Sequence, residues 1–374
     1  MKIGVPSEVE TDEYRVAITP AGVRELVQSG HEVLIQRGAG LGSGLPDEAY
    51  RNQGAELVES SAELFEKTAF IIKVKDPSTE ELDYLNEGHI LFSYLHLAPQ
   101  PELARKLMAT GATCIAYETV ELPDGRLPLL SPMSEIAGRM SAQVGAYFLE
   151  KMIGGRGVLL GGVAGVPPAK VVILGAGIVG SNAAKIAAGM LADVTVLDKN
   201  LDQLRSLQSY VSGRLTTIMS TALSIEEQVT GADLVIGAVL IAGAKAPRLI
   251  SEKMVKEMGP RAVLVDVSID QGGCSETSRM TTHTEPTFDE HDVIHYCVGN
   301  IPGAVPITST HALTNATLPY IIDIASDGIN TCIRENDALA AGVNIMEGKI
   351  TNEAVAGAVG LPFYPLSSIV PYGL

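Results

Sequence analysis

The sequence predicts an α/β protein with two doubly wound domains, and three observations lead to this fold class. The chain has 374 residues, which suits two domains of about 100 to 200 residues each. Short apolar runs alternate with amphipathic stretches, as expected for strand and helix units that build a parallel sheet. This alternation occurs twice, on either side of a glycine-rich segment at residues 154–169.

The first series lies within residues 1–129. Its apolar runs predict strands at residues 2–6, 32–36, 69–77, 89–99 and 112–120. Between them, residues 19–30 and 100–111 have apolar side chains at helical spacing and end in glycine, which suits a helix C-terminus. These residues therefore predict the first part of one α/β domain.

The second series begins at Lys170. Its apolar runs predict strands at residues 170–175, 193–198, 215–220, 233–239, 262–268 and 293–300. A long helix is expected at residues 131–153, and further long helices are expected after Asn300. We therefore predict a second domain at residues 130–307. Residues 308–374 are expected to return to the first domain, which would be discontinuous and joined to the second by long helices.

Composition and charge exclude several classes of protein. The formal net charge of −17 would repel nucleic acid. The cysteines are far apart and form no C-x-x-C pair, so neither a zinc site nor a disulfide framework is indicated, and we predict no metal. No apolar stretch approaches the roughly 20 residues that span a bilayer, and the N-terminus lacks a signal-peptide core. We expect a soluble, cytoplasmic protein without a membrane partner.

A glycine-rich turn predicts a dinucleotide site. Gly175, Gly177 and Gly180 fit G-x-G-x-x-G directly after an apolar strand and before a helix. The first glycine permits the tight turn, the second lets the backbone approach a pyrophosphate, and the third lets helix and strand pack closely. An acidic residue at the end of the next strand, Asp198, completes the pattern. A packing turn is the weaker alternative.

Asp198 bears on which dinucleotide is bound. A carboxylate at this position accepts hydrogen bonds from the adenosine ribose hydroxyls and repels a 2′-phosphate, which favours NAD over NADP. Lys199 and Arg205 are basic residues nearby that could accommodate that phosphate.

Several segments resemble the alanine dehydrogenase family, and the resemblance covers nearly the whole chain. They include "EYRVAITPAGV", "KVKDP", "LFSYLHLAP", "PLLSPMSEIAGRMSAQVGA", "GAVLIAGAKAP", "VDVSIDQGGC" and "GNIPGAVPITST". The resemblance implies a reversible, NAD-dependent oxidative deamination of L-alanine to pyruvate and ammonium. It also implies a homo-oligomer, usually a hexamer. The discontinuous domain would then bind the substrate, and residues 130–307 would form the Rossmann domain for NAD.

The family match assigns four residues to the substrate. Arg15 would bind the substrate carboxylate through its guanidinium fork. Lys75 matches the second substrate residue, although alternation along a strand places Lys73 on the same face and cannot choose between them. His96 closes a predicted strand and matches the proton-transfer histidine. Asp270 matches a carboxylate that faces nicotinamide and substrate, but a turn aspartate before two glycines is an equal alternative from the sequence alone.

The family match also assigns further cofactor contacts. These residues offer mostly backbone groups and apolar walls, and besides the three glycines and Asp198 they are Ser134, Ile178, Val179, Gln203, Ser220, Val239, Leu240, Val267, Ser268, Ile269, Arg279, Val298, Gly299, Asn300 and Ile301.

The chain departs from the family pattern at a few positions. Ser7 and Glu10 replace basic residues that are usual in the first motif, and Tyr14 stands where asparagine is common. Gln203 replaces a residue that is often basic. The first change lowers the positive potential near the substrate, and the last removes a possible adenosine contact.

Two other functions remain open from the sequence. A transhydrogenase has an NAD-binding subunit with related domains, and a cyclodeaminase-like lyase keeps its NAD bound and recycles it. The complete set of Arg15, Lys75, His96 and Asp270 favours the dehydrogenase.

Overall fold

A computed structural model describes residues 1–239 and 246–370 of the chain. They form two compact units. Unit 1 comprises Met1–Met133 and the chain from Val305 onward, and unit 2 comprises Ser134–Ala304. Each unit is an α/β assembly around its own sheet, so the predicted α/β class with two doubly wound sheets is confirmed. The boundaries expected after residues 129 and 307 stay a prediction, because compactness does not by itself define an independently folding domain.

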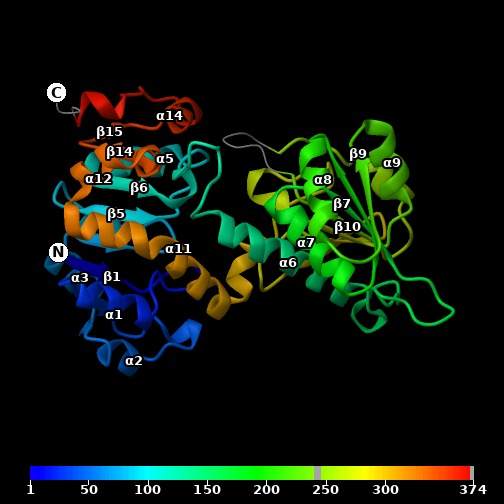
Figure 1. Ribbon diagram of the computed structural model, residues 1–374, viewed down its shortest axis with the longest axis horizontal. Helices are drawn as coiled ribbons and strands as arrows, with labels where there is room; N and C mark the ends of the chain where they lie inside the picture. Colours follow the sequence, from blue (N-terminus) through cyan, green and yellow to red (C-terminus); the bar gives the residue numbers. More distant parts are fainter. Residues whose placement is uncertain (240–245, 371–374) are drawn as a thin grey trace. The chain divides into compact units, whose positions relative to one another are not determined.

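Unit 1 contains an eight-stranded sheet with the order β15-β14-β6-β5-β4-β1-β2-β3 (Figure 1). Strands β1 to β6 run parallel, whereas β14 lies antiparallel to β6 and β15 antiparallel to β14. The strands are β1 (Lys2–Val5), β2 (Glu32–Gln36), β3 (Glu56–Val58), β4 (Phe70–Ile72), β5 (Ile90–Ser93), β6 (Thr113–Ala116), β14 (Val343–Met346) and β15 (Lys349–Ile350). The winding changes direction between β1 and β4, which are neighbours in the sheet.

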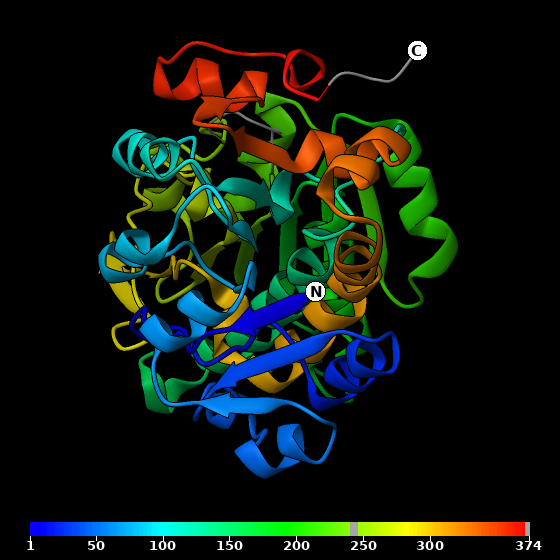
Figure 2. The same cartoon turned by 90° about the vertical axis from the view of Figure 1, so that its left-hand side faces the viewer.

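Helices accompany this sheet from one end to the other. In Figures 1 and 2, α2 lies toward the β3 end and α14 lies toward the β15 end. The helices are α1 (Pro20–Gln28), α2 (Asp47–Arg51), α3 (Ser61–Lys67), α4 (Thr79–Tyr84), α5 (Pro101–Thr110), α11 (Pro306–Asp327), α12 (Ile329–Glu335), α13 (Asp337–Gly342) and α14 (Glu353–Val359). Local chemistry sets their ends: Thr19 caps α1 through its side chain, and Gly111 ends α5 with a φ of 75°.

Three strand predictions for unit 1 were too long, and one of them is the strand expected at residues 112–120, which ends at Ala116. The expected strand at residues 69–77 ends at Ile72, and the one at residues 89–99 ends at Ser93. Single backbone bonds continue the pairing a little further, from Lys73 N to the Phe92 oxygen and from Tyr94 N to the Val74 oxygen, each at 3.1 Å. The residues that follow these two bonds leave the sheet. They form loops that carry polar side chains at its carboxyl edge.

Unit 2 contains a seven-stranded sheet with the order β12-β13-β11-β10-β7-β8-β9. All its strands are parallel except β12, which pairs antiparallel with β13. The strands are β7 (Lys170–Leu174), β8 (Asp193–Asp198), β9 (Leu215–Met219), β10 (Leu234–Gly237), β11 (Val263–Asp266), β12 (Thr287–Glu290) and β13 (Val293–Tyr296). The winding changes direction between β7 and β10, and the carboxyl ends beside such a switch point form a crevice where ligands bind in open α/β sheets.

The helices of unit 2 alternate with its strands. They are α7 (Ile178–Gly189), α8 (Leu201–Tyr210), α9 (Ala222–Thr230) and α10 (Glu252–Glu257), and α6 (Ser131–Phe148) begins at the junction with unit 1. Each unit has its own apolar core of buried side chains, of which each large aliphatic residue contributes about 1.5–3 kcal/mol. Within the described residues, no helix is long and apolar enough to cross a membrane.

Candidate active site

The carboxyl edge of the unit 1 sheet carries three of the four substrate residues expected from the sequence. Arg15 lies in the segment after β1, Lys75 in the segment after β4, and His96 three residues after β5. The chain leaves the neighbouring strands β1 and β4 in opposite directions, and ligands of open α/β sheets bind at the carboxyl ends beside such a switch point. The fold of unit 1 therefore places a guanidinium, an ammonium and an imidazole at one edge.

Arg15 is buried and paired with Glu13. Its Nε donates to Glu13 Oε1 at 2.7 Å and its Nη2 to Oε2 at 2.5 Å, in the bidentate geometry that guanidinium and carboxylate favour. Nη1 lies 3.2 Å from the Met133 sulfur. Burial works to lower the pKa of Arg15, but the hydrogen bonds and the charge of Glu13 outweigh it and raise the pKa. The guanidinium is thus permanently charged and fixed in orientation.

The structure distinguishes Lys73 from Lys75, a choice that alternation along the strand could not make. Lys73 is wholly buried, and its Nζ lies 2.8 Å from Glu81 Oε1 and 3.4 Å from Glu8 Oε2. Burial raises the pKa of Glu8, which the charge of Lys73 opposes. The Lys75 side chain is 16% exposed, and its Nζ lies 3.2 Å from Glu10 Oε2. Of the two ammonium groups, only that of Lys75 retains exposed surface that a small molecule can reach.

His96 is held at its backbone and left open at its ring. Its φ is 45°, in the left-handed region that non-glycine residues rarely adopt. The ring stacks on Tyr94 with centroids 5.9 Å apart and planes 9° apart, and Tyr94 in turn donates from its hydroxyl to the Leu129 oxygen at 2.6 Å. The side chain is 48% exposed, so the imidazole can exchange protons with bound molecules and water.

Glu118 is a residue at this edge that the sequence reasoning did not single out. It follows β6, the strand next to β5, and its carboxylate accepts the backbone N–H of His96 at 2.6 Å and of Leu95 at 3.3 Å. Its Oε1 also lies 4.0 Å from His96 Nδ1. The sequence predicted Glu118 to lie inside a strand at residues 112–120, whereas β6 ends at Ala116 and leaves Glu118 at the carboxyl edge of the sheet.

Asp76 adds a second carboxylate beside Lys75 and His96. Burial raises its pKa, the charges of Lys75 and His96 lower it, and the charge of Glu10 raises it. These effects show that the charges of Asp76, Lys75, His96 and Glu10 act on one another.

In unit 2, the predicted glycine loop connects β7 to α7. Gly175 has a φ of 104°, and a side chain there would meet the Ala238 oxygen at 2.4 Å. A side chain at Gly180 would meet the Gly175 oxygen at 1.8 Å, so helix and strand need glycine to pack this closely. A side chain at Gly177 would meet nothing within 4 Å. The space over Gly177 suits a pyrophosphate, and α7 begins there without a side-chain cap.

Asp198 ends β8 beside this loop. Its Oδ2 accepts the N–H of Ala176 at 2.6 Å, and its Oδ1 accepts the N–H of Asn200 at 2.7 Å. The carboxylate therefore lies against the glycine turn, with lone pairs left for further donors. This is the position and chemistry expected for an acceptor of ribose hydroxyls.

Asp270 lies in a short 3-10 helix, Val267–Gln271, directly after β11. It is exposed, and its Oδ1 would lie 3.2 Å from a side chain placed at Gly299, so the loops after β11 and β13 are neighbours. Ser268 joins this helix to the loop after β10, because its hydroxyl donates to the Val239 oxygen at 2.8 Å. The three loops thus form one connected surface at the carboxyl edge of the sheet.

Asp266 organises this surface and was not singled out from the sequence. It is wholly buried at the end of β11. Its Oδ1 accepts the Ser268 N–H at 3.1 Å, and its Oδ2 accepts the Cys274 N–H at 2.8 Å and the Ser278 hydroxyl at 2.6 Å. One carboxylate therefore ties together both ends of the loop that carries Asp270.

The remaining cofactor candidates also lie in unit 2. Ser220 follows β9, residues 298–301 follow β13, Gln203 lies in the first turn of α8, and Ser134 lies in α6. Arg279 is 63% exposed and lies 3.7 Å from the centroid of the Phe288 ring. Leu240 lies outside the described residues.

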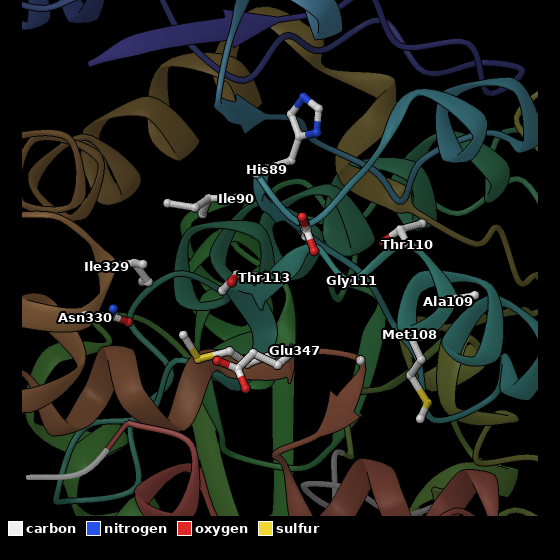
Figure 3. A pocket seen from close by; sticks show the side chains of 14 residues that line it. His89, Ile90, Met108, Ala109, Thr110, Gly111, Thr113, Ile329, Asn330 and Glu347 are labelled. Atoms are coloured by element: carbon white, nitrogen blue, oxygen red, sulfur yellow. The ribbon is translucent and has the colours of Figure 1, made fainter.

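A pocket of about 820 Å³ lies at the opposite edge of the unit 1 sheet (Figure 3). It opens where β5 and β6 begin, and its lining includes Ile90, Thr113 and Asn330. His89 in its wall is fully engaged, with its Nδ1 accepting the Asn86 N–H and its Nε2 bonded to the Phe65 oxygen. None of the expected site residues lines this pocket.

The described residues contain no group of three or more His, Cys, Asp or Glu side chains able to hold a metal ion. The four cysteines are buried free thiols.

Comparison with known proteins identifies the family. The model for the alanine dehydrogenase/PNT N-terminal domain matches residues 4–137, and the model for the C-terminal domain matches residues 141–353. The alanine dehydrogenase of Methanococcus maripaludis is 57% identical, with 98% of each chain covered. This chain belongs to the alanine dehydrogenase/PNT family. The resemblance read from the sequence motifs is therefore confirmed.

Other members of the family give the same result. The alanine dehydrogenase of Bacillus subtilis is 52% identical, with 98% of this chain and 96% of that chain covered. A solved structure of an L-alanine dehydrogenase superimposes with a TM-score of 0.93 at 48% identity, covering 96% of this chain and 99% of that chain. A transhydrogenase from Sinorhizobium meliloti, at 23% identity and a TM-score of 0.79, covers 95% of this chain and 100% of its own and shares the fold alone.

Proposed function

We propose that this protein catalyses the reversible, NAD-dependent oxidative deamination of L-alanine to pyruvate and ammonium. The observation that carries the proposal is the gathering of Arg15, Lys75 and His96 at one edge of the unit 1 sheet. A module that only binds a dinucleotide has no use for a guanidinium, an ammonium and an imidazole at a second site. Relatives that match over nearly their full length and bear the name alanine dehydrogenase support the same substrate.

The residues of unit 2 fit NAD. The open space over Gly177 and the uncapped start of α7 suit the pyrophosphate. Asp198 suits the ribose hydroxyls and would repel the 2′-phosphate of NADP. NAD held by these residues would supply the acceptor for the hydride that leaves the α-carbon of alanine. Turnover with NADP at comparable efficiency would contradict the assignment of Asp198.

In unit 1, Arg15 and Lys75 bind the substrate carboxylate. Glu13 already holds Nε and Nη2 of Arg15, so it aims the guanidinium and keeps it charged. Lys75 adds an ammonium that reaches solvent. The carboxylate is present in both alanine and pyruvate, so the same two cations hold the substrate in both directions of the reaction.

His96 handles the proton. Bound alanine first gives up one proton from its ammonium group, and loss of the hydride then leaves an iminium ion. Water attacks the iminium carbon, and His96 takes a proton from that water and returns it to the nitrogen. Loss of ammonium then yields pyruvate, so alanine, NAD and water give pyruvate, ammonium, NADH and one proton. Asp270 is proposed to hold the substrate ammonium. Glu118 and Tyr94 hold the backbone and ring of His96 in place.

The decisive experiment follows NADH absorbance with a panel of L-amino acids and NAD, and follows its loss with pyruvate and ammonium. We expect net NADH formation with L-alanine and net consumption in reverse. Deamination without net NADH would indicate an NAD-retaining lyase. NADH binding without turnover of any amino acid would indicate a nucleotide-binding subunit.

Assembly and location follow from the family resemblance and remain proposals. We expect a cytoplasmic enzyme of L-alanine catabolism that forms a homo-oligomer, a hexamer. Light scattering coupled to size exclusion would measure the mass of the particle, and a monomeric mass for the active protein would contradict this expectation.

A further inference from the structure

The segment between β1 and α1 contributes carboxylates that pair with Arg15, Lys73 and Lys75 in unit 1. Glu8 lies 3.4 Å from Lys73, and Glu10 lies 3.2 Å from Lys75. Glu13 binds Arg15 through both of its oxygens. The two cations proposed to bind the substrate carboxylate are therefore already paired with carboxylates of the protein itself.

These pairs differ in how much water reaches them. The side chains of Glu13 and Arg15 are 0% and 2% exposed, and breaking a buried pair leaves an uncompensated buried charge, which is strongly destabilising. The side chains of Glu10 and Lys75 are 54% and 16% exposed. An exposed ion pair is weak because water solvates both charges once they separate. Glu13 therefore stays on Arg15 throughout the reaction, whereas Glu10 can leave Lys75.

We propose that Glu10 is an affinity-determining residue that competes with the substrate carboxylate for Lys75. This inference rests on the proposed function, because it takes Lys75 as a substrate-binding residue. Glu10 and alanine present the same chemical group to the same ammonium. When the substrate arrives, its carboxylate either displaces Glu10 or binds beside it.

Both arrangements weaken substrate binding. Displacement loses the ion pair of Lys75 with Glu10. Binding beside Glu10 uses the remaining donors of the ammonium but brings two negative charges together. The charge of Glu10 already acts on this group, since it raises the pKa of the neighbouring Asp76.

The competition predicts a kinetic signature. Alanine and pyruvate share the carboxylate, so Glu10 raises the KM of both by the same factor. NAD, NADH and ammonium make no use of Lys75 in this scheme, so their KM values are independent of Glu10. Since ground state and transition state carry the same carboxylate, Glu10 leaves kcat unchanged.

The test compares Glu10→Gln with a matched control. Glutamine keeps the length of the side chain and removes its charge. We expect the KM for alanine and for pyruvate each to fall about two- to five-fold, the range expected for one exposed ion pair. The control is Glu32→Gln, which removes an exposed glutamate 3.1 Å from Lys2 and away from the site. It should leave both KM values unchanged, and the advantage of Glu10→Gln should shrink as salt is added.

A double-mutant cycle with Lys75→Gln separates this inference from the proposed function. If Lys75→Gln raises the KM for alanine and Glu10→Gln has no further effect in that background, competition for Lys75 is supported. If Lys75→Gln raises the KM but Glu10→Gln alone changes nothing, the competition is overturned and the assignment of Lys75 stands. An equal fall in KM for Glu32→Gln overturns it as a general charge effect. If Lys75→Gln leaves the KM unchanged, the substrate assignment and the competition fail together.

Discussion

At the scale of single residues, the important feature of the substrate edge is how each charge is held. Arg15 is fixed by a bidentate carboxylate, whereas His96 is fixed by its backbone through Glu118. The first arrangement gives a rigid cation. The second gives an imidazole whose ring nitrogens remain available for proton transfer.

Replacing Arg15 by Lys tests the rigid cation. Lysine keeps the positive charge but loses the planar fork that binds Glu13 and a second carboxylate together. We expect the KM for alanine to rise about 10- to 100-fold, the effect of losing one charge-assisted hydrogen bond. The Kd for NADH, measured by fluorescence titration, should not change. A variant with weaker NADH binding and an unchanged KM for alanine would refute the assignment.

Replacing His96 by Ala tests the proton transfer. We expect turnover to fall by on the order of 10² to 10⁴, the usual contribution of general acid–base catalysis, with NADH binding retained. In the unaltered enzyme, deamination releases a proton and amination consumes one, so higher pH should favour deamination and lower pH should favour amination. The control is His311→Ala, an exposed histidine of α11. If His96→Ala kept its activity and pH profile, Lys75 or Asp270 would become the next candidate.

At the scale of elements, the turn from β7 to α7 contains one glycine that packing requires and another that is proposed to leave room for a ligand. Gly180 is needed by the fold, because a methyl group there would meet the Gly175 oxygen at 1.8 Å. Gly177 has a φ of −67°, which alanine readily adopts, and faces open space. The same substitution at two positions of one motif therefore has different expected effects.

We expect Gly180→Ala to lower the melting temperature strongly or to prevent folding, because backbone atoms must move. Gly177→Ala should melt within a few degrees of the unaltered protein but bind NADH at least ten-fold more weakly, since the methyl group enters the space proposed for the pyrophosphate. Differential scanning fluorimetry and NADH titration measure the two effects. Unchanged NADH affinity in a folded Gly177→Ala protein would place the pyrophosphate elsewhere.

At the scale of the whole molecule, features that depend on neighbouring residues in the sequence could be predicted, whereas features that depend on pairing between distant segments could not. The glycine loop was predicted correctly because the spacing of its three glycines is visible within one short stretch of sequence. The strand β14 was not predicted, since it has four residues, one of which is the buried polar Asn344, and it becomes a strand by pairing with β6 far away in the sequence. Glu118 was missed for the same reason, because its role depends on a neighbouring strand.

The stability of the molecule should depend on pH through His295. This side chain is wholly buried in β13 between Thr277 and the Val293 oxygen, and burial lowers its pKa from the ordinary 6.5. Below that value the unfolded chain binds more protons than the folded one, so stability falls as pH falls toward the lowered pKa. The slope reaches about 1.4 kcal/mol per pH unit within this window.

His295→Gln should therefore show a smaller loss of melting temperature between pH 7.5 and roughly pH 5.5. Its absolute stability at the higher pH should be lower, because glutamine replaces a well-packed ring that stacks on Phe288. His311→Gln serves as the comparison at an exposed site. Equal pH slopes for all three proteins would show that another group controls the acid sensitivity.

The return of the chain to unit 1 determines the order in which the protein can be completed during translation. Residues 134–304 are continuous, so the whole sheet of unit 2 precedes α11 in the chain and emerges from the ribosome before it. The segment that carries Arg15 waits longer, because Thr310 of α11 accepts the Val16 N–H and bonds to Ser43. Domains generally fold as units during synthesis. A nascent chain therefore completes the nucleotide-binding half first, and its substrate edge takes shape only when the last fifth of the message is read.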